Sequence, residues 1–272
     1  MTLGDVVSAT GALGIHACLI GAQARVIWLE HVHGLRPRRA TTDTDFVIQV
    51  DDWARFDALT THLIEHCSWT KDPKQGQRFE SGSGRIVDLV PCGGVAVDDA
   101  VTLPPDHTHR MDVRGFELAL SESVALEYGD GQSVLIAPIH VLALLKIVSW
   151  WDRESGQEKD AEDLETLLRS YADTEADELL LLEDHLDLYE VEEDHERRGA
   201  RLVGRVIAAV AGESTLALVR QILSDELDDN GNLRLASQMA EGLSGDPDAR
   251  TEVAYELLDA LARGLSDETG RP

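Results

Sequence analysis

Basic residues are scarce in this chain. Its 272 residues include 24 Lys and Arg against 51 Asp and Glu, which gives a formal net charge of −27. A protein that binds nucleic acid without sequence preference must neutralise phosphates with clustered cations, so this composition disfavours that class. Only four of the basic residues are lysines. The scarcity draws attention to Lys146 and Lys159, which fall close together in the second half of the chain.

Long apolar runs and cysteines are also lacking. No segment approaches the roughly 20 apolar residues that a membrane-spanning helix needs. The start of the chain has neither the basic residues nor the apolar core of a signal peptide, so we expect a cytoplasmic protein without membrane contacts. Cys18, Cys67 and Cys92 are widely spaced and form no CxxC pair, and they predict neither a disulfide framework nor a zinc site.

The hydrophobic content, 43%, is enough to bury a substantial core in one large domain or two modest ones. In the first half, short apolar runs alternate with amphipathic stretches, which is typical of mixed α and β structure. The expected elements are a strand over 16–20, a helix over 23–33, a strand over 44–50, a helix over 53–66 and a strand over 85–90. Gly34 is expected to end the first helix and Pro91 the last strand.

From Pro138 onward the pattern is helical. Proline is favoured in a first helical turn, so a buried helix is expected over 138–151. Further helices are expected over 159–171, 200–212 and 214–227, followed by a polar tail that frays. The stretch from Glu158 to Asp194 holds 16 acidic and two basic residues, which predicts a solvated helical face. The whole pattern predicts an α+β protein with a mixed sheet in residues 1–137 and a helical domain in residues 138–272.

Two aspartates, Asp43 and Asp45, stand at the start of the strand TDFVIQV. Because side chains alternate along a strand, both carboxylates point to the same face, with their Cα atoms about 6 to 7 Å apart. Two such charges repel each other unless a cation lies between them, and hard oxygen ligands suit Mg²⁺ or Mn²⁺. An ordinary acidic turn before a strand is the alternative.

Asp88 lies within the otherwise apolar strand IVDLV, where an ionised carboxylate is costly unless it is paired or bound to metal. If this strand neighbours the one that carries Asp43 and Asp45, three carboxylates converge. The first two can then hold metal, while Asp88 completes the site and accepts the proton of an attacking hydroxyl. Outward projection from an edge strand is the alternative.

A turn and an arginine are candidates for binding phosphate. Gly21 and Ala22 form a tight strand-to-helix turn, and the following helix directs free backbone N–H groups at an anion. Arg39, which precedes the two aspartates, can fork onto phosphate oxygens. An arginine that is simply solvated beside Pro37 is the alternative.

Two of the four lysines fall in the same helical hairpin. Lys146 interrupts the apolar run VLALLKIV, so it must extend to solvent or find an anion. Lys159 and Asp163 stand four residues apart, on one helix face and within pairing range. A surface ion pair is the alternative for the second lysine.

These pieces occur in a defined order along the chain. They are the strand and the turn Gly21-Ala22, the run Arg39-x-Thr41-x-Asp43-x-Asp45, the run Asp88-Leu89-Val90-Pro91, the Lys146 helix and the run Lys159-Asp160-x-x-Asp163-Leu164. The combination, over residues 10–170, resembles the AbiEii/AbiGii-type nucleotidyltransferases. That family belongs to the polymerase-β-like nucleotidyltransferase superfamily and includes abortive-infection and toxin–antitoxin toxins.

The resemblance implies a nucleotidyltransferase fold in residues 1–137 and a helical domain, residues 138–272, that completes the active-site cleft. It implies that Asp43 and Asp45 bind a metal-bound nucleoside triphosphate, with Asp88 as the third carboxylate. The other catalytic residues that it implies are Lys146 and Asp163. The substrate-binding set is Gly21, Ala22, Arg39, Thr41, Lys146, Lys159 and Asp160.

We therefore predict a nucleotidyltransferase that uses Mg²⁺ or Mn²⁺ to transfer NMP from NTP to an acceptor hydroxyl, releasing pyrophosphate. The acceptor, whether an RNA 3′ end such as that of tRNA, a protein side chain or a small molecule, is left open, as is an antitoxin partner. A catalytically degenerate module that binds nucleotide or protein is the alternative, because Ala22 stands where the family has Ser or Gly. A third alternative, an acidic helical interaction protein, rests on residues 158–194.

Overall fold

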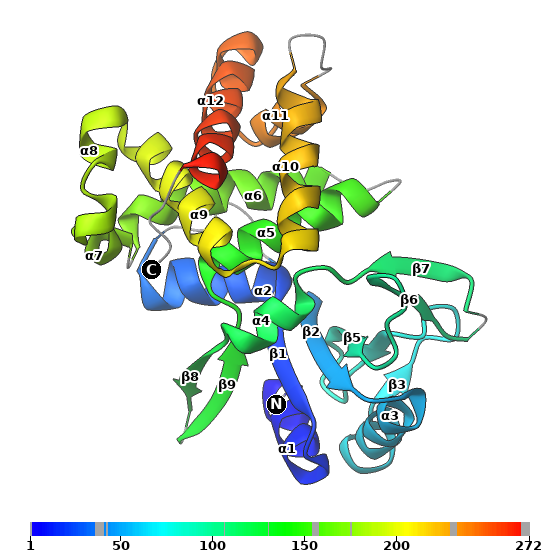
Figure 1. Ribbon diagram of the computed structural model, residues 1–272. Helices are drawn as coiled ribbons and strands as arrows, with labels where there is room; N and C mark the ends of the chain where they lie inside the picture. The colour runs from blue at the N-terminus through cyan, green and yellow to red at the C-terminus, as the bar shows by residue number, and fades with distance from the viewer. Residues whose placement is uncertain are drawn as a thin grey trace. The chain divides into compact units, whose positions relative to one another are not determined.

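The computed structural model describes residues 2–35, 41, 43–105, 107–129, 131–153, 158–174, 176–228 and 233–267 (Figure 1). The backbone divides into two compact units: residues 1–26 with 39–138, and residues 27–38 with 139–272. Within the described ranges, every strand belongs to the first unit and the second is helical, so the fold is α+β. No helix in these ranges is both long and apolar enough to cross a membrane. The grouping of residues 27–38 with the second unit was not predicted.

The first unit is built on a mixed sheet. Among the described residues its strands run in the order β3-β4-β5-β2-β1-β9-β8. β2 pairs antiparallel with β1 and parallel with β5, while β9 runs parallel to β1. A separate small sheet pairs β6 with β7. The bounds are β1 His16–Ile20, β2 Asp43–Val50, β3 Thr70–Lys71, β4 Arg78–Glu80, β5 Ile86–Gly93, β6 Ala100–Leu103, β7 His109–Asp112, β8 Val124–Tyr128 and β9 Gln132–Ile136.

The core of the first unit follows from the alternation of β2. Phe46 and Ile48 lie on one face of this strand and are buried, and α3, which contacts β2, contributes Phe56 and Leu59. The side chain of Asp52 caps α3 by accepting a hydrogen bond from a backbone N–H in its first turn. The helices of this unit are α1 Thr2–Leu13, α2 Gly21–Val26, α3 Trp53–Cys67 and α4 Phe116–Ser121.

The predicted strands over 16–20 and 44–50 and the helix over 53–66 are confirmed, but β5 does not end at Pro91. It continues to Gly93, with Pro91 in register with Ile48 of β2. The N–H of Leu89 points toward the β4 side and donates to the carbonyl of Gln77. The nitrogen of Pro91, two residues further on, faces the same side, where β4 has ended. No ladder hydrogen bond is lost there, so the proline is tolerated.

The second unit is helical, and the helices predicted over 138–151, 159–171, 200–212 and 214–227 are confirmed within a few residues. The helix predicted over 23–33 is split between α2 of the first unit and a π-helical segment, η1. The bounds are η1 Ile27–Val32, α5 Ile139–Asp152, α6 Glu158–Ser170, η2 Tyr171–Asp173, α7 Ala176–Leu180, η3 Glu183–His185, α8 Leu188–Val191, α9 His195–Val210, α10 Glu213–Leu227, α11 Arg234–Ala240 and α12 Pro247–Ser266.

The prediction that the polar tail frays is wrong for residues 247–266. Residues 247–266 form α12, which lies beside α9 (Figure 1). Gly204 of α9 permits the close approach, since an added Cβ there would lie only 2.7 Å from the backbone nitrogen of Leu265. Asp246 caps the N-terminus of α12, and Leu257 and Leu261 are buried. Tertiary packing therefore orders a segment whose polar composition alone favours fraying.

Candidate functional site

Asp43 and Asp45 lie on one face of β2, as predicted. The strand begins at Asp43, and its side chains alternate between a half-buried face that carries both aspartates and a fully buried face that carries Thr44 and Phe46. The apolar positions of this strand thus fix its orientation against the core, and the two carboxylates point away from that core together.

β5 brings the third carboxylate to the same face. It runs parallel to β2, and Asp45 and Asp88 are direct partners in the register. Partners on neighbouring strands project to the same side, with the strands about 4.8 Å apart. The two strands are therefore neighbours, which is the condition for the three carboxylates to converge. β5 is paired on both sides, by β2 and β4, so projection from an edge strand is excluded.

Sequence reasoning missed a fourth residue on this face, Arg78. β4 pairs antiparallel with β5 and places Arg78 directly opposite Asp88. Its Nε donates to Asp88 Oδ1 at 2.9 Å and its Nη2 to Oδ2 at 2.7 Å. Hydrogen bonding to Asp88 raises the pKa of Arg78 above its ordinary value, and the charges of Asp43 and Asp45 act in the same direction. The sequence signal was the short turn 81–84 between two strand-like segments, which predicts a hairpin.

Arg78 compensates the negative charge of Asp88. The carboxylate of Asp88 accepts both hydrogen bonds of the guanidinium fork, so a protein cation already compensates its charge. Across the described ranges, no group of three or more His, Cys, Asp or Glu side chains is arranged to hold a metal ion. The roles of Asp88 as third metal ligand and proton acceptor stay predictions.

The turn at Gly21 lies against Asp45. Gly21 follows β1 directly, and Ile20 is the register partner of Asp45. The glycine has φ +71°, and an added Cβ would lie 2.9 Å from Asp45 Cγ. Both the backbone conformation and the nearby carboxylate therefore require glycine here. Ala22, the next residue, is buried, and its methyl side chain has no polar group that could bind a ligand.

The residues just before β2 are described only in part. Thr41 donates from its hydroxyl to the backbone carbonyl of Asp43 at 3.3 Å, which steadies the start of the strand. Arg39 lies outside the described residues, as do Arg36 and Arg38.

The second unit holds a separate ion cluster. Lys146 of α5 places Nζ 2.8 Å from Asp160 Oδ1 and 2.7 Å from Asp163 Oδ2, both on α6. Arg153 adds a second cation, 3.0 Å from Asp160. Burial lowers the pKa of Lys146, but the two carboxylates outweigh it and the net shift is upward. Lys146 thus finds its anion inside the protein, and the cluster ties the two helices together.

The ion cluster bears on the surface ion pair between Lys159 and Asp163, which was the alternative interpretation for Lys159. Asp163 is buried and forms an ion pair with Lys146 instead, while Lys159 is exposed in the first turn of α6. The sequence drew attention to the lysines and aspartates of this hairpin. It did not indicate that Lys146 of α5 pairs with Asp160 and Asp163 of α6, because the i, i+4 rule considers one helix at a time.

No family model and no curated protein sequence matches this chain. A nucleotidyltransferase-like antigenic protein from Paracoccidioides brasiliensis resembles it with a TM-score of 0.38 and 15% identity, over 70% of this chain and 89% of that one. The CCA-adding enzyme of Thermotoga maritima, complexed with tRNA, resembles it with a TM-score of 0.23 and 11% identity, over 98% of this chain and 82% of that one. TM-scores this low do not establish a common fold.

Proposed function

We propose that this protein is a metal-dependent nucleotidyltransferase that transfers NMP from NTP to an acceptor hydroxyl and releases pyrophosphate. The observation that supports the proposal is the strand register, which gathers Asp43, Asp45 and Asp88 on one face beside the turn at Gly21. Catalysis of phosphoryl transfer depends mainly on positioning the reacting groups and on compensating the charge of the phosphates. Carboxylates that can hold a metal ion beside a glycine turn can serve both purposes.

The donor set fits a bound Mg²⁺ or Mn²⁺. Magnesium is usually held by one or two carboxylates, with substrate phosphates and water as the remaining ligands. Asp43 and Asp45, two half-buried carboxylates on alternate positions of one strand face, meet that requirement without a third protein ligand. When bound, the metal neutralises triphosphate charge and polarises the phosphoryl oxygens.

The remaining roles belong to groups of the chain itself. Gly21 lets the triphosphate approach the backbone beside Asp45, and Arg39 and Thr41 lie just before the aspartates in the sequence. Asp88 accepts the proton of the acceptor hydroxyl. The acceptor oxygen then bonds to the α-phosphorus as the bond to the bridging oxygen breaks, and pyrophosphate leaves.

The resemblance also implies roles in the reaction for residues of the α5–α6 hairpin. We assign Lys159, which is exposed, to binding phosphate. Lys146, Asp160 and Asp163 are buried in mutual ion pairs, which favours a positioning role: they hold the hairpin that carries Lys159. Breaking the cluster therefore affects activity through the hairpin.

The finer assignment is to the AbiEii/AbiGii-type enzymes, and it rests on the sequence motifs alone. On that basis the protein is a candidate toxin with an antitoxin partner, and an RNA 3′ end such as that of tRNA or a protein side chain is the candidate acceptor. The net charge of −27 repels RNA. An RNA acceptor therefore needs a local basic strip, for which the sequence offers Arg36, Arg38 and Arg39.

The test is incorporation of label from α-labelled NTPs in the presence of Mg²⁺, with total RNA, tRNA and a protein extract as acceptors. We expect Asp43→Asn and Asp45→Asn each to reduce incorporation by about 100-fold or more, since each removes a metal ligand. Asp57→Asn, on the exposed surface of α3, is the matched control and should leave incorporation unchanged. Equal incorporation by all of these proteins contradicts the proposal.

A nucleotide-binding module without catalysis is the second candidate. The bidentate pair of Arg78 and Asp88 favours it, because the proposed proton acceptor is held by a cation. Calorimetry with Mg²⁺ and NTP separates the two candidates. Binding that Asp43→Asn abolishes, without label incorporation into any acceptor, supports the module and excludes the transferase.

A further inference from the structure

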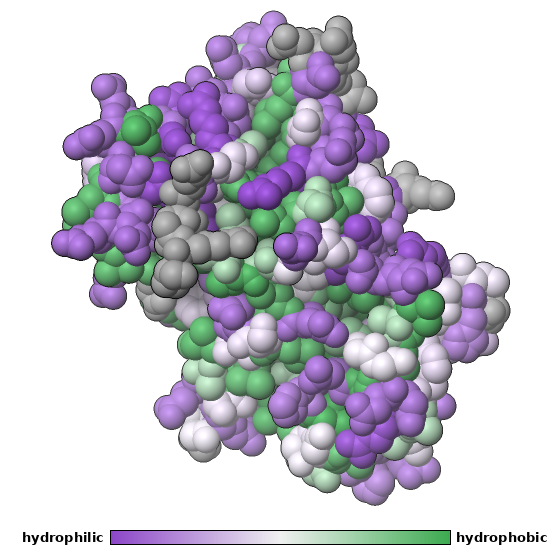
Figure 2. Space-filling model, viewed as in Figure 1, coloured by the Kyte–Doolittle hydropathy of each residue, from purple (hydrophilic) through white to green (hydrophobic). Residues whose placement is uncertain are grey.

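Five exposed apolar side chains gather in one short segment of the second unit. Leu181, Leu182, Leu186, Tyr189 and Val191 are between 43% and 68% exposed. Residues 181–191, which include η3 and α8, are called the apolar ridge below. Figure 2 shows apolar surface beside strongly hydrophilic surface at the left of the view, where Figure 1 places α7 and α8. Grouped apolar side chains rimmed by polar residues mark interaction surfaces, whereas scattered ones do not.

The ridge is anchored, so these side chains are held outward. Leu188 is fully buried beneath it. Arg205 of α9 donates from Nη1 and Nη2 to the two carboxylate oxygens of Asp187, at 2.7 and 2.6 Å. The guanidinium of Arg198 lies over the ring of Tyr189, 4.4 Å from its centroid. A segment fixed at these points presents its apolar face instead of folding it inward.

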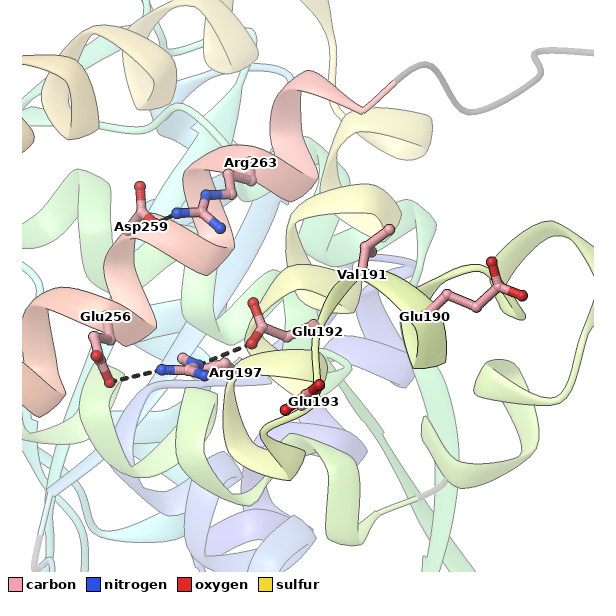
Figure 3. A pocket seen from close by; sticks show the side chains of 8 residues that line it. All are labelled: Glu190, Val191, Glu192, Glu193, Arg197, Glu256, Asp259 and Arg263. Atoms are coloured by element: carbon pink, nitrogen blue, oxygen red, sulfur yellow. Dashed lines mark hydrogen bonds and ion pairs between the residues drawn. The ribbon is translucent and has the colours of Figure 1, made fainter.

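Acidic residues predominate in the ridge and in the residues that follow it. Residues 181–194 include seven Asp and Glu and no Lys or Arg. Beside the end of the ridge, residues of α8, α9 and α12 and of the segment between α8 and α9 line a pocket of about 430 Å³ (Figure 3). Figure 3 shows Arg197 between Glu192 and Glu256, with which it forms ion pairs. Five carboxylates against two guanidinium groups leave the lining with a formal charge of −3, which favours a cationic occupant.

We propose that the apolar ridge and the acidic pocket together bind a basic amphipathic helix of a partner protein. The apolar face of such a helix, with residues at i, i+3, i+4 and i+7, covers the exposed leucines. Its Lys or Arg side chains meet the acidic rim, and one of them enters the pocket. This surface does not depend on the proposed catalytic activity.

Charge selects this occupant over others. Nucleic acid and anionic lipid headgroups are repelled by the acidic rim. A second copy of this chain carries the same charge of −27 and the same acidic segment, so like surfaces would repel each other. A partner with cations next to an apolar stripe is complementary in both respects.

The test uses the full-length protein and three labelled peptides of about 18 residues, five helical turns. The first has Leu on one helical face and Lys on the other. The second keeps every Lys but has Ser for Leu, and the third keeps every Leu but has Glu for Lys. By fluorescence anisotropy we expect the first peptide to bind at least about ten-fold more tightly than the second, and the third not to bind. Equal affinity for the first two peptides means general charge attraction only and overturns the proposal.

Matched variants locate the binding surface. The pair Leu181→Ser and Leu186→Ser should weaken the binding of the first peptide by about ten-fold or more. Val97→Ser changes a more exposed apolar residue of the first unit and should leave the affinity for this peptide unchanged. The pair Glu190→Gln and Glu193→Gln reduces the negative charge of the pocket and should also weaken the binding of the first peptide. The pair Asp57→Asn and Glu65→Gln, exposed on α3, removes the same charge elsewhere. If each ridge or pocket variant binds as its control does, the peptide binds another surface and the proposal is wrong.

Discussion

Replacing Lys146 by methionine tests the buried ion cluster that joins α5 and α6. Lys146 Nζ lies within 2.8 Å of both Asp160 and Asp163, and its side chain is only 13% exposed. Methionine fills a similar volume without charge, so both carboxylates lose this cation. Removing one partner of a buried ion pair costs about 3 to 5 kcal/mol. Asp160 keeps its contact with Arg153, so we expect a loss near the lower end, about 3 kcal/mol.

The pKa of Lys146 sets the pH dependence of this contribution. Burial lowers that pKa, but Asp160 and Asp163 raise it by more, so the folded-state pKa lies above the ordinary 10.5. A group whose pKa is raised by folding stabilises the folded state fully at pH values below its pKa in the unfolded chain. This stabilisation is lost as the pH rises through the pKa of the group in the folded protein. The wild type should therefore lose this contribution only above pH 10.5, whereas Lys146→Met should show no alkaline loss from this position.

The assay is urea unfolding followed by far-UV circular dichroism, from about pH 7 to pH 11. Lys159→Met is the matched control, because it makes the same change at an exposed position of the same hairpin. Its free energy of unfolding should stay within about 0.5 kcal/mol of the wild type. If Lys146→Met costs no more than Lys159→Met, the ion cluster does not stabilise the protein and the reasoning above is refuted.

Two further predictions concern the strand face. Gly21→Ala should weaken Mg²⁺-NTP binding by about ten-fold or more, measured by calorimetry, because the new Cβ displaces the Asp45 carboxylate. Gly14→Ala is the control: Gly14 has φ +62° and no neighbour within 4 Å, so the substitution causes the same backbone strain without touching a carboxylate. It should bind Mg²⁺-NTP normally, and an equal loss of affinity in both variants would show that backbone strain alone is the cause. Arg78→Ala should lower the free energy of unfolding by about 1 to 2 kcal/mol, because two hydrogen bonds to Asp88 are lost. Arg78→Lys should lower it by less, since lysine keeps the charge. An unchanged urea midpoint for Arg78→Ala would contradict this prediction.

Local patterns predicted several elements correctly, although α1, α4 and the outer strands of the sheet were not predicted. The alternation in TDFVIQV and the helical spacing of 53–66 depend only on which side chains must be buried, and that requirement is written in the sequence. Pro91 and the tail were predicted wrongly because their outcome depends on partners. The missing N–H of Pro91 would cost a ladder hydrogen bond only if β4 extended far enough to lie opposite this residue. The helix α12 is ordered by its packing against α9.

For the candidate site, the sequence by itself determined that Asp43 and Asp45 share a face, because a strand alternates with a period of two whatever surrounds it. Only the tertiary structure decided that Asp88 lies in register with Asp45 and that Arg78 forms the fork onto it. The same holds for Lys146, which pairs with residues of the next helix. The physical reason is that strand register and helix packing are fixed by many weak contacts between distant segments, which no local spacing in the chain encodes.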